Sequence, residues 1–141
     1  MDHLNIPILP GNYAGDHPVA AATTIPQGAL VALNAAGDAV PAATGVTGHI
    51  IGKAEAGVDN SAGAAGAKTV RVIRGIFSCA LDGTNPPTKA HIGTRVYGFA
   101  ADTVANLTGG ITCRGGILLG FDDSGRAIVD FTFVTKSATY A

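Results

Sequence analysis

Few residues of this chain have the types and spacing that a reaction or a metal site requires. The four histidines, at positions 3, 17, 49 and 91, are spread over a chain of 141 residues. No two of them have the His-x-x-x-His spacing of a local metal pair. We therefore predict that they are solvated or hydrogen-bonded side chains and that the chain has no metal site.

The segment Asp122-Asp123-Ser124-Gly125 is similar to a calcium-binding loop, because acidic residues stand beside a glycine. An EF-hand loop, however, takes its ligands from alternating acidic residues and from a glutamate further along. Neither is present here. The segment is therefore predicted to be a hairpin turn.

No motif supplies an activated nucleophile or a phosphate site. Ser78 precedes Cys79 without the Gly-x-Ser-x-Gly pattern of a nucleophile elbow, and Gly115-Gly116 is not followed by the Lys-Ser/Thr of a phosphate loop. Folding could still bring His, Asp and Ser side chains together, so a small β-barrel hydrolase stays an open alternative. We predict that the protein is not an enzyme and has no catalytic residue and no cofactor.

The elements that must position any site are clearer, because two segments repeat one pattern. Gly28 to Val40, GALVALNAAGDAV, matches Gly116 to Ile128, GILLGFDDSGRAI. In each, an apolar run meets Asn or Asp, then two residues and a glycine. This order is typical of a type I turn followed by a left-handed residue in a bulged hairpin.

Composition indicates one domain with an unusual surface. Hydrophobic residues make up 47% of the chain, but aromatic residues only 6%, and there is no tryptophan. The core must therefore consist of Val, Ile, Leu and Ala. Charged residues are 13%, about half of the ~25% usual in soluble domains. A surface of Ala, Thr, Ser and Gly is easily desolvated, so we expect the protein to sit in an assembly.

Charge and hydropathy exclude other classes. A net charge of -1 with scattered basic residues argues against a nucleic-acid partner. No apolar run approaches the ~18 residues of a membrane span, and MDHLNIPILPGNY lacks the basic start of a secretory signal. We expect a chain made where thiols are reduced, with Cys79 and Cys113 free and buried; a disulfide is the open alternative.

The pattern along the chain predicts an all-β fold. Residues 1–18 contain Pro7, Pro10 and Pro18 and are expected to form an extended arm, and residues 19–141 a single β domain. We expect strands at 28–33, 39–42, 50–58, 68–81 with a bulge at Gly75, 95–100, 111–113 and 127–134. Many short strands with glycine turns predict an antiparallel sandwich or barrel, jelly-roll-like in form.

The same segments resemble a known family. IPQGALVALNAAGDAVPA, HIIGKAEAGVDNSAGAAGAKTVRVIRGIF, LDGTNPPTKAHIGTRVYGFA, ADTVAN and ILLGFDDSGRAIVDF are similar to the capsid decoration, or cement, proteins of tailed bacteriophages and prophages. The resemblance covers Thr24 to Phe131. Its most specific pieces are the Gly-Ala-Leu-Val hairpin, GVDNSAG at 57–63 and DGTNP at 82–86. The N-terminal arm and the C-terminal TKSATYA depart from the family pattern.

The resemblance implies a structural protein on the outer capsid surface, made in the cytoplasm of the bacterial host. Its implied partners are the major capsid protein and further copies of itself, as a homodimer or homotrimer. Such a protein would bridge subunits of the matured shell against the pressure of the packaged DNA. Cementing needs interface area rather than a reactive group.

Two further expectations concern particular side chains. A neighbouring subunit is expected to bind the apolar residues of the arm, although these could equally pack on their own domain; they are Leu4, Ile6, Ile8, Leu9 and Tyr13. Phe131 and Phe133 alternate in phase with Ala127 and Val129, so we expect them in the core. A carbohydrate- or receptor-binding module on the virion is the alternative function, though the chain has few aromatic residues for sugar stacking.

Overall fold

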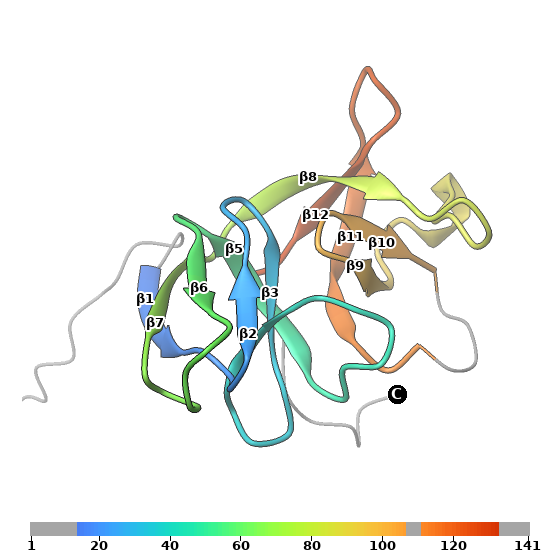
Figure 1. Cartoon of the computed structure of the whole chain (residues 1–141). Helices are drawn as coiled ribbons and strands as arrows, with labels where there is room; N and C mark the ends of the chain where they lie inside the picture. The colour runs from blue at the N-terminus through green and yellow to red at the C-terminus, as the bar shows by residue number, and fades with distance from the viewer. Residues whose placement is uncertain (1–13, 107–110, 133–141) are drawn as a thin grey trace, which may run out of the picture.

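The computed structural model describes residues 14–106 and 111–132 (Figure 1), and over these residues the chain is almost entirely β-strand. The short 3₁₀ turn η1 spans Lys89–His91. The strands are β1 Ala14–Pro18, β2 Thr23–Ile25, β3 Leu30–Leu33, β4 Ala39–Pro41, β5 His49–Ala54, β6 Val58–Asn60, β7 Thr69–Ile73, β8 Ile76–Leu81, β9 Arg95–Ala100, β10 Thr103–Ala105, β11 Arg114–Phe121 and β12 Ala127–Asp130. The all-β prediction is confirmed.

One group of strands closes into a ring, which we call the barrel. Strands β11, β12, β8, β10 and β9 pair in that order, and β9 pairs back to β11. These strands lie together on the right in Figure 1, where the hairpin between β11 and β12 projects from the top of the molecule. Closure leaves none of these strands as a free sheet edge along its whole length.

A second group, which we call the flanking sheet, contains β1, β7, β5, β3 and β4 in that order. Its ends meet at a single isolated bridge between Val19 and Ala39. The two groups join where β5 pairs with β11 at His49 and Arg114. A separate pair, β2 with β6, makes a small two-stranded sheet.

The purely antiparallel arrangement expected from the sequence is wrong for two pairs of strands. Strands β8 and β10 are parallel, and so are β5 and β11. Parallel neighbours need a long crossover, and both pairs have one. The chain makes η1 and β9 between β8 and β10, and the five strands β6 to β10 lie between β5 and β11 in sequence.

The chain passes from one sheet to another at two points where the sequence predicts a single long strand. The predicted strand 68–81 is broken at Arg74 and Gly75, so that β7 belongs to the flanking sheet and β8 to the barrel. The predicted strand 50–58 ends at Ala54, and Val58 begins β6 in the small sheet. Segment 111–113 precedes the strand β11 instead of forming one.

The two matching hairpins form as predicted. In the first, the Gly37 N–H donates to the Asn34 carbonyl at 3.0 Å, and Gly37 has a φ of 89°. In the second, the Gly125 N–H donates to the Asp122 carbonyl at 3.0 Å, and Gly125 has a φ of 85°. These are type I turns followed by a left-handed glycine.

Each group of strands has its own core. The barrel core holds the larger side chains, among them Phe131, Leu118 and Ile50, with Val96, Val104, Val129 and both cysteines. The core of the flanking sheet is made mainly of valine, alanine and isoleucine: Val19, Ile25, Ala29, Val31, Ala39, Ile51, Ala54, Val70 and Val72. Strands β3 and β5 contribute alternate residues to both cores. They form the wall between them.

Phe131 occupies the core as expected, with no exposed surface. Its ring stacks on that of Phe77, with the ring centroids 6.1 Å apart. Ala127, Val129 and Phe131 are all buried, which confirms the period of two. Phe133 lies outside the described residues.

Of the expected arm, residues 1–18, the structure describes only residues 14–18. Residues 14–18 form β1, which pairs antiparallel with β7 along its whole length. The five apolar residues expected to bind a neighbour, Leu4, Ile6, Ile8, Leu9 and Tyr13, lie outside the described residues.

Candidate interaction face

The histidines occupy separate elements. His17 lies on β1, His49 is buried on β5, and His91 ends η1. The pKa of His17 is lowered below its usual value, first by burial of the imidazole and second by the positive charge of Arg74. Within residues 14–106 and 111–132, no three His, Cys, Asp or Glu side chains are grouped so that they could hold a metal ion. His3 is outside the described residues.

The Asp122 segment is a turn whose carboxylate binds its own backbone. Asp122 Oδ1 accepts hydrogen bonds from the N–H groups of Ser124 at 3.0 Å and Arg126 at 2.9 Å. Asn34 Oδ1 does the same in the first hairpin, accepting from Ala36 and Asp38 at 3.0 Å each. Hydrogen bonds, above all from Ser124 and Ser78, lower the pKa of Asp122 to about 2.

Ser78 is tied into the same hairpin. Its hydroxyl donates to Asp122 Oδ2 at 2.8 Å, and Arg126 Nε donates to its Oγ at 3.1 Å. The serine thus links β8 to the projecting turn between β11 and β12.

Both cysteines are free and buried in the barrel core. Burial raises the pKa of the Cys79 thiol to about 11 and also raises that of Cys113. Since the thiolate is the reactive form, both thiols are poor nucleophiles in the folded protein. The prediction of two free buried cysteines is confirmed.

The Gly115-Gly116 pair is explained by close approach of neighbouring strands. A Cβ on Gly115 would lie 2.6 Å from the Val96 carbonyl oxygen, and one on Gly116 would lie 2.1 Å from that of Asp130. At this point β11 is paired with β9 along one edge and with β12 along the other. The glycines allow the backbones to meet.

The segments that carry the family resemblance also have structural roles. Asn60, in GVDNSAG, is buried and donates through Nδ2 to the carbonyls of Val19 at 3.4 Å and of Ala20 and Ala64 at 3.0 Å each. Asp82, in DGTNP, is buried and accepts from the Asn85 N–H at 2.9 Å. The first segment contains strand β6 and the turn after it, and the second is the loop after β8; side-chain hydrogen bonds hold both.

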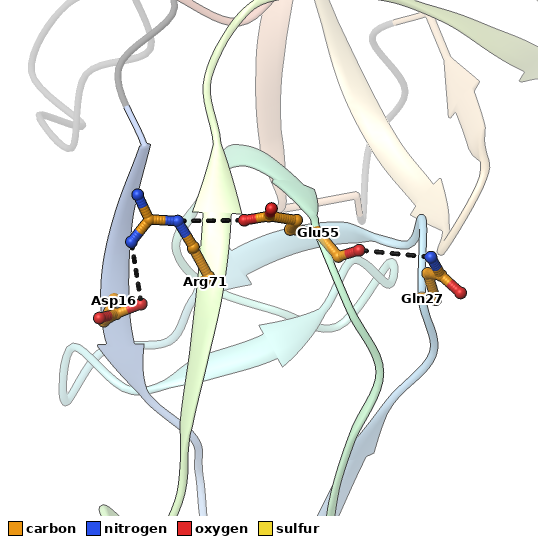
Figure 2. Close-up of polar contacts among 4 residues, drawn as sticks. All are labelled: Asp16, Gln27, Glu55 and Arg71. Atoms are coloured by element: carbon orange, nitrogen blue, oxygen red, sulfur yellow. Dashed lines mark hydrogen bonds and ion pairs between the residues drawn. The ribbon is translucent and has the colours of Figure 1, made fainter.

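An exposed ionic cluster links three segments of the flanking sheet (Figure 2). Arg71 on β7 lies 3.0 Å from Glu55 Oε2 through Nε, and 3.7 Å from Asp16 Oδ1 through NH1. Gln27 donates to the Glu55 carbonyl at 3.4 Å. All three charged side chains are about half exposed, so the cluster is expected to add little stability.

A hollow of about 1080 Å³ lies on the outer side of the barrel. Its floor comes from the paired strands β9 and β11. Around it stand the turn after η1, the loop before β5 and the segments on either side of residues 107–110. The described residues that line it are Thr47, His91, Gly93, Thr94, Arg95, Tyr97, Asn106, Ile111, Thr112, Arg114 and Ile117.

Exposed apolar side chains lie beside this hollow. Gly93 N–H donates to the Leu118 carbonyl at 2.8 Å. Ile92 and Leu119, next in sequence to these two residues, are 46% and 45% exposed. Phe99, on β9, is 40% exposed. We call the outer side of β9 and β11, with the η1 turn, the interaction face.

Sequence reasoning missed this face. The basic residues are scattered along the chain, but β-pairing brings Arg95 and Arg114 to adjacent strands. The alternation of Arg95, Tyr97 and Phe99 with buried Val96 and Gly98 was a usable signal for one outward face. Its partner strand could not be identified without the topology.

Comparisons with known proteins do not assign this chain to a family. A scan against family models, a search of curated proteins and a search of solved structures each returned no match. The class defined by the structure is therefore a mixed all-β domain, a five-stranded barrel joined to a flanking sheet. In the described part of the chain, no helix is long and apolar enough to cross a membrane.

Proposed function

We propose that this protein is a capsid decoration protein of a tailed bacteriophage or prophage. It binds the outside of the shell built by the major capsid protein and bridges shell subunits. The proposal rests first on the resemblance over Thr24 to Phe131. The observation that carries it is that the most specific pieces of that resemblance are framework elements of the domain: a hairpin turn, strand β6 with the turn after it, and a hydrogen-bonded loop.

The surface chemistry also supports a binding role. The interaction face combines exposed Ile92, Phe99 and Leu119 with an open hollow. Stable interfaces bury ~1,200–2,000 Å² in total and need such apolar contacts at their centre. A chain with 13% charged residues has little charge to desolvate when it is covered.

The test is co-sedimentation of the purified protein with expanded and unexpanded capsids that lack it, from the phage that encodes it. We expect saturable binding that makes expanded shells more resistant to heat. Absence of binding to both kinds of shell would contradict the proposal. A glycan-array signal in its place would favour a receptor-binding module.

The arm is a separate part of the proposal. We propose that Leu4, Ile6, Ile8, Leu9 and Tyr13 contact a neighbouring subunit, either the major capsid protein or another copy of this chain. Deleting residues 2–13 should abolish shell binding while leaving the circular dichroism spectrum and melting temperature of the domain unchanged. Unfolding of the truncated protein would show that these residues pack on their own domain.

A further inference from the structure

The floor of the hollow carries two arginines on adjacent strands. On β9, Val96 and Gly98 are buried, while Arg95 and Tyr97 between them point outward and are half-buried. In the antiparallel register, Tyr97 lies opposite Arg114, and Arg95 lies opposite Ile117. All four of these residues line the hollow. The result is two guanidinium groups on a partly apolar floor.

The rim of the hollow is held in place by side-chain hydrogen bonds. Thr94 Oγ1 donates to the His91 carbonyl at 2.6 Å, and Thr112 Oγ1 donates to that of Val46 at 2.8 Å. Asn106 Nδ2 donates to the Pro86 carbonyl at 3.2 Å. Each bond fixes a different part of the rim. The described part of the hollow is therefore formed before any ligand arrives, which lowers the cost of binding.

The charge of the hollow is positive and not neutralised by the described residues. None of the described lining residues is acidic. Within residues 14–106 and 111–132, both ion pairs belong to Arg71, so neither Arg95 nor Arg114 has a carboxylate within 4.0 Å there. Half-buried arginines on an apolar floor are well placed for bidentate bonds to carboxylates.

We propose that the hollow binds an acidic segment of the shell protein, with carboxylates on Arg95 and Arg114 and an apolar side chain between Tyr97 and Ile117. This inference rests on the proposed function and names the chemistry of the partner at its interaction face. The apolar floor favours a peptide segment over a free phosphate, which would leave that surface unused. The net charge of -1 disfavours nucleic acid.

The experiment compares two variants that each lose two positive charges. Arg95→Gln with Arg114→Gln changes the hollow. Lys68→Gln with Arg74→Gln is the matched control, since both residues flank β7 in the flanking sheet and neither lines the hollow nor lies on the interaction face. Circular dichroism and melting temperature establish that each variant is folded. The probe is a labelled synthetic peptide of alternating Glu and Leu, with a Gln and Leu peptide beside it, measured by fluorescence anisotropy.

We expect the hollow variant to lose about tenfold or more in affinity for the Glu peptide, and the control variant to lose less than about twofold. Amide signals of β9 and β11 should shift in nuclear magnetic resonance spectra when the Glu peptide is added. Equal losses in both variants, or equal binding of the Gln peptide, would overturn the inference. Displacement of the peptide by equimolar inorganic phosphate would show a small-anion site and would also overturn it.

Shell binding separates this inference from the proposed function. Wild-type protein that sediments with expanded shells, together with a hollow variant that sediments equally well, would overturn the inference and leave the function standing. Wild-type protein that binds the Glu peptide but no shell would overturn the function and the assignment of the segment to the shell protein. Loss of shell binding in the hollow variant alone supports both.

Discussion

The barrel and the flanking sheet close in different ways. The barrel closes through successive ladders, from β11 round to β9 and back. The flanking sheet meets its own end at one bridge, between Val19 and Ala39. Its core is also built from smaller side chains, whereas the barrel contains Phe131 and Leu118.

The difference shows where polar side chains join separate backbone segments. Beside the single bridge of the flanking sheet stands Asn60, whose amide binds the carbonyls of Val19 and Ala20. On the outside of the same sheet, Arg71 joins β1 to the segment after β5. Both groups have side-chain ties, but the tie between Ser78 and Asp122 lies on the outside of the barrel, whereas the buried Asn60 stands beside the one bridge that closes the flanking sheet.

The largest expected effect comes from the barrel core. Phe131→Ala should lower the free energy of unfolding by roughly 3–5 kcal/mol, because it removes a fully buried ring. Phe99→Ala, on the exposed side of β9, is the control and should cost less than ~1 kcal/mol. Both are measured by urea denaturation. An unchanged unfolding midpoint for Phe131→Ala would place that ring outside the core.

The next effect tests the tie in the flanking sheet. Asn60→Ala should cost roughly 1–3 kcal/mol, because it removes a buried side chain that donates to the carbonyls of Val19 and Ala20. Ser61→Ala, at an exposed neighbouring position, is the control. Hydrogen exchange should show faster opening around Val19 than in β11. Equal exchange rates in the barrel and in the flanking sheet would contradict the difference between these two groups of strands.

A smaller effect is expected from the exposed cluster. Arg71→Gln should cost about 0–1 kcal/mol, since exposed ion pairs are screened by water and salt. A double-mutant cycle with Glu55→Gln measures the coupling between the two side chains. The coupling should shrink as salt is added. A salt-independent loss above ~2 kcal/mol would mean that Arg71 has a buried structural role.

The smallest effect on stability at neutral pH is expected from exchanging the turn residues of the two hairpins. Asp122→Asn should keep the turn, because Asn34 makes the same backbone contacts in the first hairpin. The pKa of Asp122 is lowered to about 2 in the folded state, below the ~3.9 of a free Asp. Its contribution to stability is therefore present above ~3.9 and lost as the pH falls through about 2.

Asp122→Asn should accordingly flatten the acid limb of a stability profile measured by thermal melting between pH 5 and 2. Asn34→Asp is the reciprocal change and should make that limb steeper. If neither variant alters the limb, the hydrogen bonds to the Asp122 carboxylate do not stabilise the fold.

Local sequence was enough to predict the local structure. The hairpins depend on a turn residue and on a left-handed glycine three positions later, both visible in the chain. The burial of Phe131 follows from a period of two. Gly75 lies at a break between strands and not at the predicted bulge, because the apolar residues on its two sides look alike in sequence although they belong to different groups of strands.

The pairings and the interaction face could not be predicted in the same way. Parallel contacts such as His49 with Arg114 join residues far apart in the chain, and no local pattern records them. Arg95 and Arg114 become neighbours through the ladder between β9 and β11. Their shared hollow is a product of topology.

The alternation of β3 and β5 between the two cores has a consequence for how the molecule denatures. Leu30 and Ile50 face one core, and Val31 and Ile51 face the other. If either strand slipped by one residue, the side chains that face the barrel core would turn to the core of the flanking sheet, and the reverse. Because β3 and β5 are shared, unfolding of one core would expose the strands that cover the other core. Calorimetry should therefore record a single cooperative transition, with equal calorimetric and van't Hoff enthalpies.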